Sequence, residues 1–557
     1  MTGRGEPKVA QTPVLIVGAG PVGAVLALEL ARHGVRSVVV ERAPWPSVHP
    51  KMDFINGRSM ELLRRLGLVE QIRAVGIEPR HSTDFLWTRG FHEPPVLVWH
   101  QPSVDQLRRQ YATINDGTAP AEPYQRVQGS LLERLLRDTI RAHPLIDLRE
   151  GWTFTDLDQD TDGVHARVVD HTTKTRHTIS ARFLVACDGA RSTVRRWLDI
   201  PMDQAGEPTQ YCSVYFRSRD PILRRHGRAF LTFAAKGLTL VSRDEDEVWT
   251  ASMPIPPGVP MVSDPIATAQ ERLGARFDVI EVMSVAQWEG SLAVARNYRR
   301  GSVFLAGDSA HHYYPAGAHG VNTGIGDAVD LGWKLAAVTS GWGGPRLLDS
   351  YERERRPVAI LNRELCADLL EVMRRFSRLA ELGAPREQLS GILEQEKYQI
   401  DNVGVHFGHR YFDSPVIEHE PGDGPRWDWH RITPSTWPGG RAPTVRLASG
   451  EQILDRFGSE FTLVDLSAHE VGAPLVMRAL DRGIPMTHLA LDDPAVRACW
   501  ERELVLVRPD QHVAWRSNAA PPDWDRVLDL VTGQPVDRSR ECVMVSRTGD
   551  STSSEQS

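Results

Sequence analysis

The sequence predicts a multidomain α/β fold, and three features of the chain support this class. A βαβ pattern occupies residues 13–42, where two apolar runs enclose a glycine turn and a helix-like segment. A strand-rich stretch lies at 205–295, with aromatic residues between Pro/Gly turns. A smaller α/β pattern follows a Pro/Gly/Trp-rich segment that ends at residue 443. At 557 residues the chain exceeds one hydrophobic core, so several domains are expected.

The composition favours a small-molecule partner. Lys plus Arg number 65 and Asp plus Glu 72, and the net charge of −7 gives no electrostatic reason to bind nucleic acid or an anionic membrane. The apolar stretch 14–30 is interrupted by three glycines, a proline and Glu29, so it is not a bilayer-spanning run. The five cysteines form no CxxC pair and no metal-ligand spacing, which predicts free thiols, no metal site and a cytoplasmic location.

Each further element follows from its own periodicity. Apolar residues recur at helical spacing over 57–75 and 130–142, which predicts two helices that cover a sheet. Residues 300–307, RGSVFLAG, predict a short buried strand. A loop and a helix beginning near Asn322 come next, and a helical stretch covers 347–398.

The glycine turn of the βαβ unit is the sharpest local motif. Glycines allow a tight turn and close backbone approach, and the following helix presents free N–H groups to a pyrophosphate. Glu41 ends the next strand, where a carboxylate can accept hydrogen bonds from a ribose diol. The motif suits FAD and NAD equally, because both contain adenosine diphosphate. It predicts these cofactor-binding residues: Gly18, Gly20, Pro21, Val22, Gly23, Glu41 and Arg42.

Two later segments carry further fingerprints. Residues 187–195 contain Asp-Gly followed by Arg and Ser, and residues 305–322 contain a strand ending in Gly-Asp, then Ala-His and a Pro/Gly loop. In these segments the chain resembles the single-component, class A flavoprotein aromatic hydroxylases, which include phenol, chlorophenol and polyketide hydroxylases. The resemblance implies FAD as cofactor. It adds these cofactor-binding residues: Arg58, Gln128, Asp188, Gly307, Asp308, Pro315, Gly320, Val321 and Asn322.

The same resemblance implies the reaction. An FAD-dependent NAD(P)H monooxygenase is expected, with NADPH or NADH as transient co-substrate and O2 as oxidant. It would hydroxylate a phenolic or polyketide-like aromatic molecule through a flavin C4a-hydroperoxide. Asp308 can accept hydrogen bonds from the ribityl or ribose chain, and the helix N-terminus near Asn322 can stabilise negative charge on the reduced flavin.

The resemblance covers nearly the whole chain and assigns its domains. A Rossmann-like FAD-binding domain would carry an inserted, p-hydroxybenzoate hydroxylase-like β-sheet for the substrate and a C-terminal thioredoxin-like domain. The predicted boundaries are a tail at 1–12, the FAD-binding domain at 13–80, 112–200 and 296–398, the β-layer at 81–111 and 201–295, a linker at 399–443, the thioredoxin-like domain at 444–546 and a tail at 547–557.

The catalytic residues are less defined, because the cofactor carries the chemistry. His311, His312, His319 and Tyr215 are candidates. The substrate chamber is expected between the β-layer and the Pro/Gly loop at residues 315–322, which we call the flavin loop. Its candidate wall residues are Tyr211, Tyr215, Trp249, Trp288 and Tyr313.

Other activities fit the same scaffold. Baeyer–Villiger oxidation and epoxidation use the same flavin chemistry and stay open, as does a non-catalytic flavin-binding role. A flavin-dependent halogenase would need a tryptophan-rich WxWxIP-like segment, which is absent. The C-terminal module has no CxxC and therefore no dithiol exchange, which favours a role in packing or in a homodimer or higher homo-oligomer.

Overall fold

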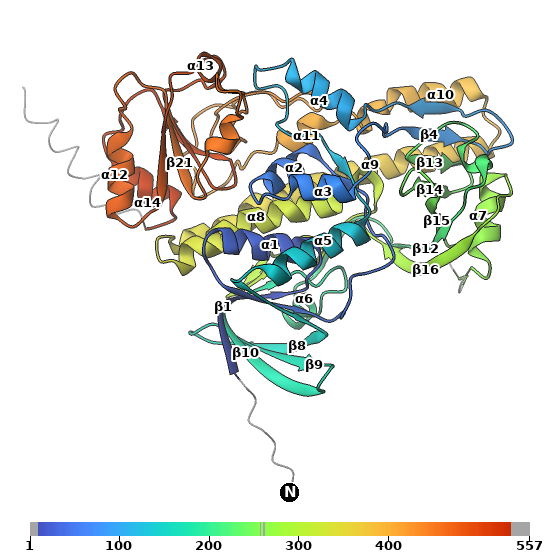
Figure 1. The fold of residues 1–557 in the computed structure, drawn as a ribbon, viewed down its shortest axis with the longest axis horizontal. Helices are drawn as coiled ribbons and strands as arrows, with labels where there is room; N and C mark the ends of the chain where they lie inside the picture. The colour runs from blue at the N-terminus through green and yellow to red at the C-terminus, as the bar shows by residue number, and fades with distance from the viewer. Residues whose placement is uncertain (1–8, 257, 260–261, 536–557) are drawn as a thin grey trace, which may run out of the picture.

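The computed structural model describes residues 9–256, 258–259 and 262–535 (Figure 1). The predicted tail at 547–557 and residues 1–8 of the predicted N-terminal tail lie outside this range. In Figure 1 a central domain stands between a C-terminal domain, at the left, and a β-layer, at the right. No helix in the described part of the chain has both the length and the apolarity needed to cross a bilayer.

The central domain is built on an eight-stranded sheet. Its parallel part runs β19-β10-β1-β2-β7, and β18 and the β8–β9 hairpin extend it in antiparallel fashion. Burial on both faces explains why β1 and β2 read as continuous apolar runs. The strands are β1 (Val9–Val17), β2 (Ser37–Glu41), β7 (Ile146–Glu150), β8 (Trp152–Gln159), β9 (Val164–Asp170), β10 (Thr175–Ala186), β18 (Arg299–Arg300) and β19 (Val303–Leu305).

Helices cover this sheet, and α8 lies against both α1 and the long helix α9 (Figure 1). Helix α8 is buried along most of its length, and its polar residues Asp327, Asp330 and Lys334 are buried with its apolar ones. The helices of the domain are α1 (Pro21–Arg32), α2 (Gly57–Arg64), α3 (Val69–Val75), α5 (Gly129–Ala142), α6 (Thr193–Trp197), α8 (His319–Thr339), α9 (Pro345–Glu381) and α10 (Arg386–Gln395).

Three sequence-based boundaries differ from the structure. The first strand begins at Val9, inside the predicted tail, because residues 9–12 pair with β10. The predicted helix at 57–75 is two helices, α2 and α3, separated where Gly67 adopts φ +70°. Helix α8 begins at His319 rather than near Asn322, directly after a left-handed turn at Ala318.

The β-layer is a seven-stranded sheet in the order β16-β12-β15-β14-β13-β4-β5. Strands β4 and β5 come from residues 85–99. Strand β4 pairs with β13 and β5 pairs with β4, so two distant segments build one sheet. Helix α7 (Pro265–Leu273) covers one face. The strands are β4 (Phe85–Thr88), β5 (Leu97–Trp99), β12 (Thr209–Arg217), β13 (Leu231–Ala234), β14 (Leu238–Ser242), β15 (Val248–Pro254) and β16 (Glu281–Gly290).

The C-terminal domain is a four-stranded sheet in the order β22-β21-β23-β24, with one parallel and two antiparallel pairs. Its elements are β21 (Phe461–Asp465), α12 (Ala473–Asp481), β22 (Met486–Ala490), α13 (Pro494–Cys499), β23 (Leu504–Val507), β24 (Val513–Ser517) and α14 (Trp524–Val531). The predicted fold class, a Rossmann-like domain with an inserted β-sheet and a C-terminal α/β domain, is confirmed.

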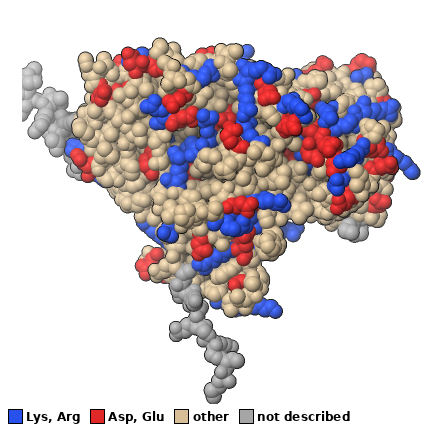
Figure 2. Space-filling view, viewed as in Figure 1, with Lys and Arg blue, Asp and Glu red and all other residues tan. Residues whose placement is uncertain are grey.

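Short elements connect these three bodies. Two small sheets are formed by β3 (Phe54–Ile55) with β6 (Gln125–Arg126), and by β11 (Met202–Gln204), β17 (Ala293–Ala295) and β20 (His311–His312). The remaining helices are α4 (Val104–Ala112), α11 (Val403–Phe407) and the 3₁₀ turns at 221–224, 307–309, 316–318, 397–399 and 453–456. On the face shown in Figure 2, basic and acidic side chains are interspersed.

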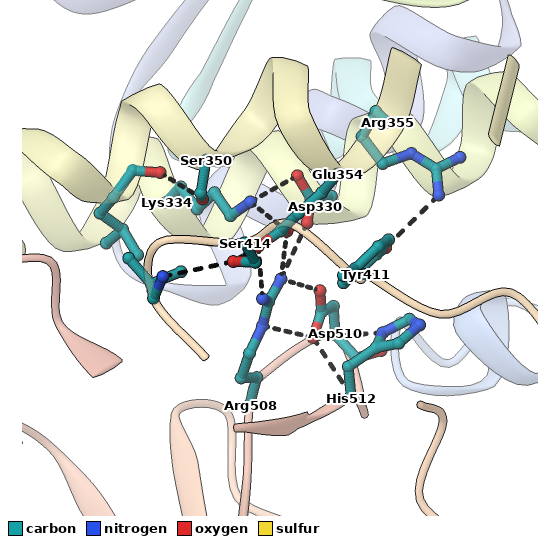
Figure 3. A network of polar contacts seen from close by, with 12 residues as sticks. Asp330, Lys334, Ser350, Glu354, Arg355, Tyr411, Ser414, Arg508, Asp510 and His512 are labelled. Carbon is teal, nitrogen blue, oxygen red and sulfur yellow. Dashed lines mark hydrogen bonds and ion pairs between the residues drawn. The ribbon is translucent and has the colours of Figure 1, made fainter. Parts of the chain in front are cut away.

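A buried network of charges joins the C-terminal domain to α8 and α9 (Figure 3). Arg508, which follows β23, bonds both carboxylate oxygens of Glu354 at 2.7 Å and lies 2.6 Å from Asp510. Lys334 lies 2.8 Å from Asp330 and 2.5 Å from Glu354. All five side chains are at most 3% exposed.

Three carboxylates therefore face two cations, and all five groups are buried. The pKa values of the carboxyl groups respond to this imbalance of charge. Burial raises the pKa of Asp330 well above its usual range, although Lys334 opposes this shift. Burial alone would also raise the pKa of Glu354, but Arg508 and Lys334 outweigh it and lower that pKa. The raised pKa of Asp330 favours its neutral form, which lowers the cost of burying three carboxylates with two cations.

Replacing Arg508 with Met should destabilise the protein by about 3–5 kcal/mol, because Glu354 and Asp510 lose the cation that compensates their burial. Urea denaturation followed by circular dichroism would measure the loss. The control is Arg497→Met, whose ion pair with Asp492 is exposed and is worth at most about 1 kcal/mol. Equal losses of stability in the two variants would contradict the conclusion that Arg508 holds the C-terminal domain to α8 and α9.

Candidate functional site

The glycine turn between β1 and α1 packs directly on the segment after β10. Gly18 has φ +107°, and a Cβ there would overlap the carbonyl of Cys187. A Cβ on Gly20, in contrast, would meet nothing within 4 Å. Helix α1 starts at Pro21 without a side-chain cap. Free N–H groups therefore face open space at this helix start, which suits a pyrophosphate.

Glu41 is tied to the same turn. One carboxylate oxygen accepts from the Ala19 amide at 2.8 Å, and the other accepts from the Ala43 amide at 2.8 Å. The side chain thereby fixes the glycine turn to the end of β2. Arg42 is exposed beside it. Ribose recognition by Glu41 and cofactor contact by Arg42 stay predictions.

Asp188 lies at the start of the second fingerprint and has an unused acceptor. One carboxylate oxygen accepts from the Thr193 amide at 2.7 Å and the Val194 amide at 3.2 Å, which caps α6. The other oxygen, Oδ1, is buried and has no hydrogen-bond partner among the described residues. An orphaned buried carboxylate oxygen next to the glycine turn is what a cofactor's hydrogen-bond donor would satisfy.

The arginine that braces this turn is Arg195, which sequence reasoning did not single out. Its guanidinium donates to the Ser309 carbonyl at 3.0 Å and to the Ala190 carbonyl at 3.4 Å, so it joins the second and third fingerprints. Arg191, the arginine nearest to the Asp-Gly pair, is exposed. The helical spacing of α6 turns Arg195 inward and could have identified it.

Val22 locks the third fingerprint against the first. Gly307 has φ +63°, and a Cβ there would lie 2.9 Å from the Val22 side chain. A Cβ at Gly324 would lie 2.5 Å from the same side chain. Asp308, the next residue, is exposed, and no described residue donates a hydrogen bond to its carboxylate. Asp308 lies beside Gly320 at the start of α8, at the same edge as the glycine turn.

The loop after Pro315 ends at the N-terminus of α8. Gly317 and Ala318 both adopt positive φ, and α8 then begins without a side-chain cap, with Gly320 and Val321 in its first turn. Asn322 ties this helix start to β3. Its amide donates to the carbonyls of Phe54 and Ala318, and its oxygen accepts from the Asn56 amide at 3.0 Å.

The residues fit FAD on these observations. Two uncapped helix starts, at α1 and α8, and two carboxylates with free acceptor positions, on Asp188 and Asp308, lie along one edge of the parallel sheet. Ligands of open α/β sheets bind outside the carboxyl ends of the strands, which is where these groups lie. The individual contacts predicted for Gly23, Pro315, Val321 and Asn322 stay predictions.

Two predicted contacts have other partners. The Arg58 guanidinium donates to the side chain of Gln511 at 2.6 Å and to the carbonyl of Asp510 at 2.8 Å, so it holds the C-terminal domain. Gln128 precedes α5, and its side-chain oxygen accepts from the Tyr215 hydroxyl at 3.1 Å, which bridges the two sides of the expected chamber.

The three histidine candidates differ in environment. His311 is fully buried and lies 2.9 Å from Asp327, whose other oxygen accepts from Arg355. His312 lies between Ser291 and Arg195, and burial lowers its pKa to about 4. His319 is buried, with its ring against the backbone of Gly317. His311 thus has a buried hydrogen-bond partner and no exposed ring atoms, and its catalytic role stays a prediction.

The aromatic wall of the expected chamber is formed by Tyr211 and Trp288, whose rings stack at 4.5 Å, with Tyr314 edge-on to Tyr211 at 5.9 Å. The expectation for Trp249 is wrong, because its register turns it toward α7, where it is 3% exposed in the core. Tyr313 donates to the carbonyl of Ala359 on α9.

A polar cavity of about 60 Å³ lies on the other face of α8 from Gly320 and Gly324. It is enclosed by α2, α8, α9, α11 and the C-terminal loop, and its lining includes His319, His406, His409 and His512. Burial and the neighbouring His406 lower the pKa of His319 to about 3, and burial lowers the pKa of His406 to about 4. These rings are therefore neutral at neutral pH.

Comparison with known proteins places this geometry among flavoproteins. Residues 11–363 match the family described as FAD binding domain, and residues 435–535 match the aromatic-ring hydroxylase C-terminal family. The FAD-dependent monooxygenase apdD of Emericella nidulans is 33% identical, over 93% of this chain and 90% of its own. Tetracenomycin B2 monooxygenase-dioxygenase of Streptomyces olivaceus is 32% identical, over 95% and 99%.

A solved structure agrees with these relatives. RebC with bound 7-carboxy-K252c superposes with a TM-score of 0.84 at 32% identity, covering 95% of this chain and all of that one. The agreement extends over the central domain, the β-layer and the C-terminal domain together, because nearly every residue is included.

Replacing Asp308 with Ala should weaken FAD binding by about 10- to 100-fold, because a charged acceptor hydrogen bond is worth roughly 1.5–3 kcal/mol. Fluorescence titration of FAD into the apoprotein would measure the dissociation constant. The control is Asp162→Ala, an exposed carboxylate in the β8–β9 hairpin. An unchanged constant for the Asp308 variant would remove this residue from the cofactor site.

Stability should fall as the pH drops from about 6.5 toward 4. In the unfolded state His319 and His406 take up protons below their ordinary pKa of 6.5. In the folded state their pKa values are about 3 and about 4, so they take up protons only at lower pH. Each pKa unit is worth about 1.4 kcal/mol, so the two residues together cost several kcal/mol. Urea midpoints at pH 7.5, 6 and 5 would show this slope. His406→Phe should flatten it, and an equally steep slope would contradict the assignment.

Proposed function

The chain belongs to the FAD-dependent aromatic-ring hydroxylases, and from this premise we propose that it hydroxylates a polycyclic phenolic or polyketide-like molecule with NAD(P)H and O2. FAD supplies the redox chemistry when bound, since it accepts a hydride from NAD(P)H and activates O2. The observation that carries the proposal is the convergence of three fingerprints beside an aromatic chamber wall.

The residues of this chain would bind the cofactor, orient it and shield it from water. The helix starts of α1 and α8 and the carboxylates of Asp188 and Asp308 would hold the dinucleotide. The amide N–H groups at the start of α8 would stabilise negative charge on the flavin's pyrimidine edge. The β-layer covers the flavin-facing side, which excludes water that would promote release of peroxide.

The chamber wall supports an extended aromatic substrate. Tyr211 and Trp288 present a stacked pair with an interplanar angle of 11°, and a planar ring system can pack against such a surface. The relatives named for tetracenomycin B2 and the RebC complex with 7-carboxy-K252c are associated with such molecules. We infer a substrate larger than one ring for this chain.

We further propose that the protein works in the cytoplasm. The four cysteines among the described residues, Cys187, Cys212, Cys366 and Cys499, are all unpaired, and free thiols persist in a reducing compartment. A homodimer or higher homo-oligomer is the assembly that the sequence favours, and size-exclusion chromatography would measure it.

The purified protein should be yellow, and its NAD(P)H oxidation should rise at least about tenfold when a phenolic polycycle is added, because reduction without substrate wastes the cofactor. Mass spectrometry after reaction under ¹⁸O2 should show one labelled oxygen in the product. A ring hydroxyl identifies hydroxylation, whereas a lactone or epoxide identifies the Baeyer–Villiger or epoxidising alternative. Flavin binding without any oxygenated product would reduce the protein to a flavin-binding role.

A further inference from the structure

The chamber-facing side of the β-layer carries a row of hydroxyl groups. Residues paired across antiparallel strands share a face, so Tyr215 on β12 lies beside Thr250 on β15 and Ser284 on β16. Val214 and Phe216 point the other way, into the core under α7. Tyr215 reaches Gln128 of the central domain, so this row faces the predicted flavin side.

A loop of the central domain brings His49 onto this row. Its Nδ1 lies 2.8 Å from the Ser284 hydroxyl oxygen, and its ring stands edge-on to Tyr215 at 6.1 Å and 75°. Nε2 makes no hydrogen bond with any described residue. If Nδ1 carries the hydrogen and donates it to Ser284, the lone pair on Nε2 is free to accept a proton.

The groups around His49 keep its ring neutral. Burial lowers the pKa of His49. The positive charges of Arg243, which follows β14, and of Lys51, on the same loop as His49, lower this pKa further. The carboxylate of Asp53 could compete as an acceptor, but it is ion-paired with Arg243, which also donates to Thr250 at 2.9 Å. His49 is therefore the acceptor in this group without a cationic partner.

We propose that His49 accepts the proton of the substrate's phenolic hydroxyl and that Ser284 is the positioning residue that fixes its tautomer. This rests on the proposed hydroxylase function. The phenolic O–H bond breaks, its electron pair stays on oxygen, and a new N–H bond forms at Nε2. The resulting phenolate is richer in electrons at its ortho and para carbons, where an electrophilic oxygen attacks.

The proton balance closes over one turnover, which takes up one proton from solvent. When a ring carbon gains oxygen, its hydrogen leaves as a proton to the departing oxygen atom, which becomes water, and aromaticity returns. His49 then gives its proton back to the phenolate oxygen. One oxygen atom of O2 enters the product, the other leaves as water, and NAD(P)H supplies the two electrons, so His49 ends each turnover neutral.

The test uses the FAD-loaded full-length protein and the substitution His49→Asn. The Asn amide can still donate to Ser284 from the position of Nδ1, so the loop stays anchored, but the basic Nε2 is gone. The probe is 4-nitrocatechol, whose ionisation changes its visible absorbance. Bound to the unmodified enzyme, it should ionise at a pH at least one unit lower than in His49→Asn, which is a tenfold change in the equilibrium.

Further variants separate the roles. Ser284→Ala should lose part of the shift, and His171→Asn, an exposed hairpin histidine, should lose none. On the phenolic polycycle that stimulates NAD(P)H oxidation, kcat at pH 7 should fall about 100-fold in His49→Asn.

Equal probe ionisation in the unmodified and His49→Asn enzymes, including the case in which neither binds it as the phenolate, overturns the proposal. Loss of the shift in Asp53→Asn with its retention in His49→Asn overturns it as well. Failure of the hydroxylase function itself looks different, because then no phenol yields an oxygenated product with the unmodified enzyme.

Discussion

The cofactor site depends on close backbone packing among three distant segments. Gly18 lies against the carbonyl of Cys187, and the side chain of Val22 fills the space left by Gly307 and Gly324. Side chains at these glycines would push the segments apart, so the absence of a Cβ is what lets Asp188 and Asp308 reach the same edge of the sheet. Arg195 then fixes the second segment to the third. The close fit at the glycines thus brings the three segments together, and charged side chains complete the site.

Helix α8 transmits this arrangement to the rest of the molecule. Its N-terminus lies in the flavin loop, its middle pairs Asp327 with His311 and Arg355, and its C-terminal half carries Asp330 and Lys334 in the buried network. Arg508 of the C-terminal domain completes that network. The network therefore ties the C-terminal domain to the helix whose N-terminus lies at the predicted cofactor site.

The expected chamber lies where two domains meet. The β-layer supplies the aromatic wall and the hydroxyl row, and the central domain supplies Gln128 and His49. The proposed substrate site thus draws on both domains.

The sequence by itself determined the fold class and the dinucleotide-binding turn, and its resemblance to a known family implied FAD. Glycines with positive φ, helix starts after strands and an acidic residue at a strand end are local features, so the pattern of residues specifies them directly. It also placed Tyr215 and Gln128 among the candidates, and these two side chains touch.

Only the tertiary structure decided which side chains meet across the chain. His49 and Ser284 are 235 residues apart, and Arg58 and Gln511 are 453 apart, so no local periodicity relates them. The same holds for the inward turn of Trp249 and the burial of His311. A local pattern sets backbone conformation, whereas the direction in which a polar side chain points is set by the partner that packing brings to it.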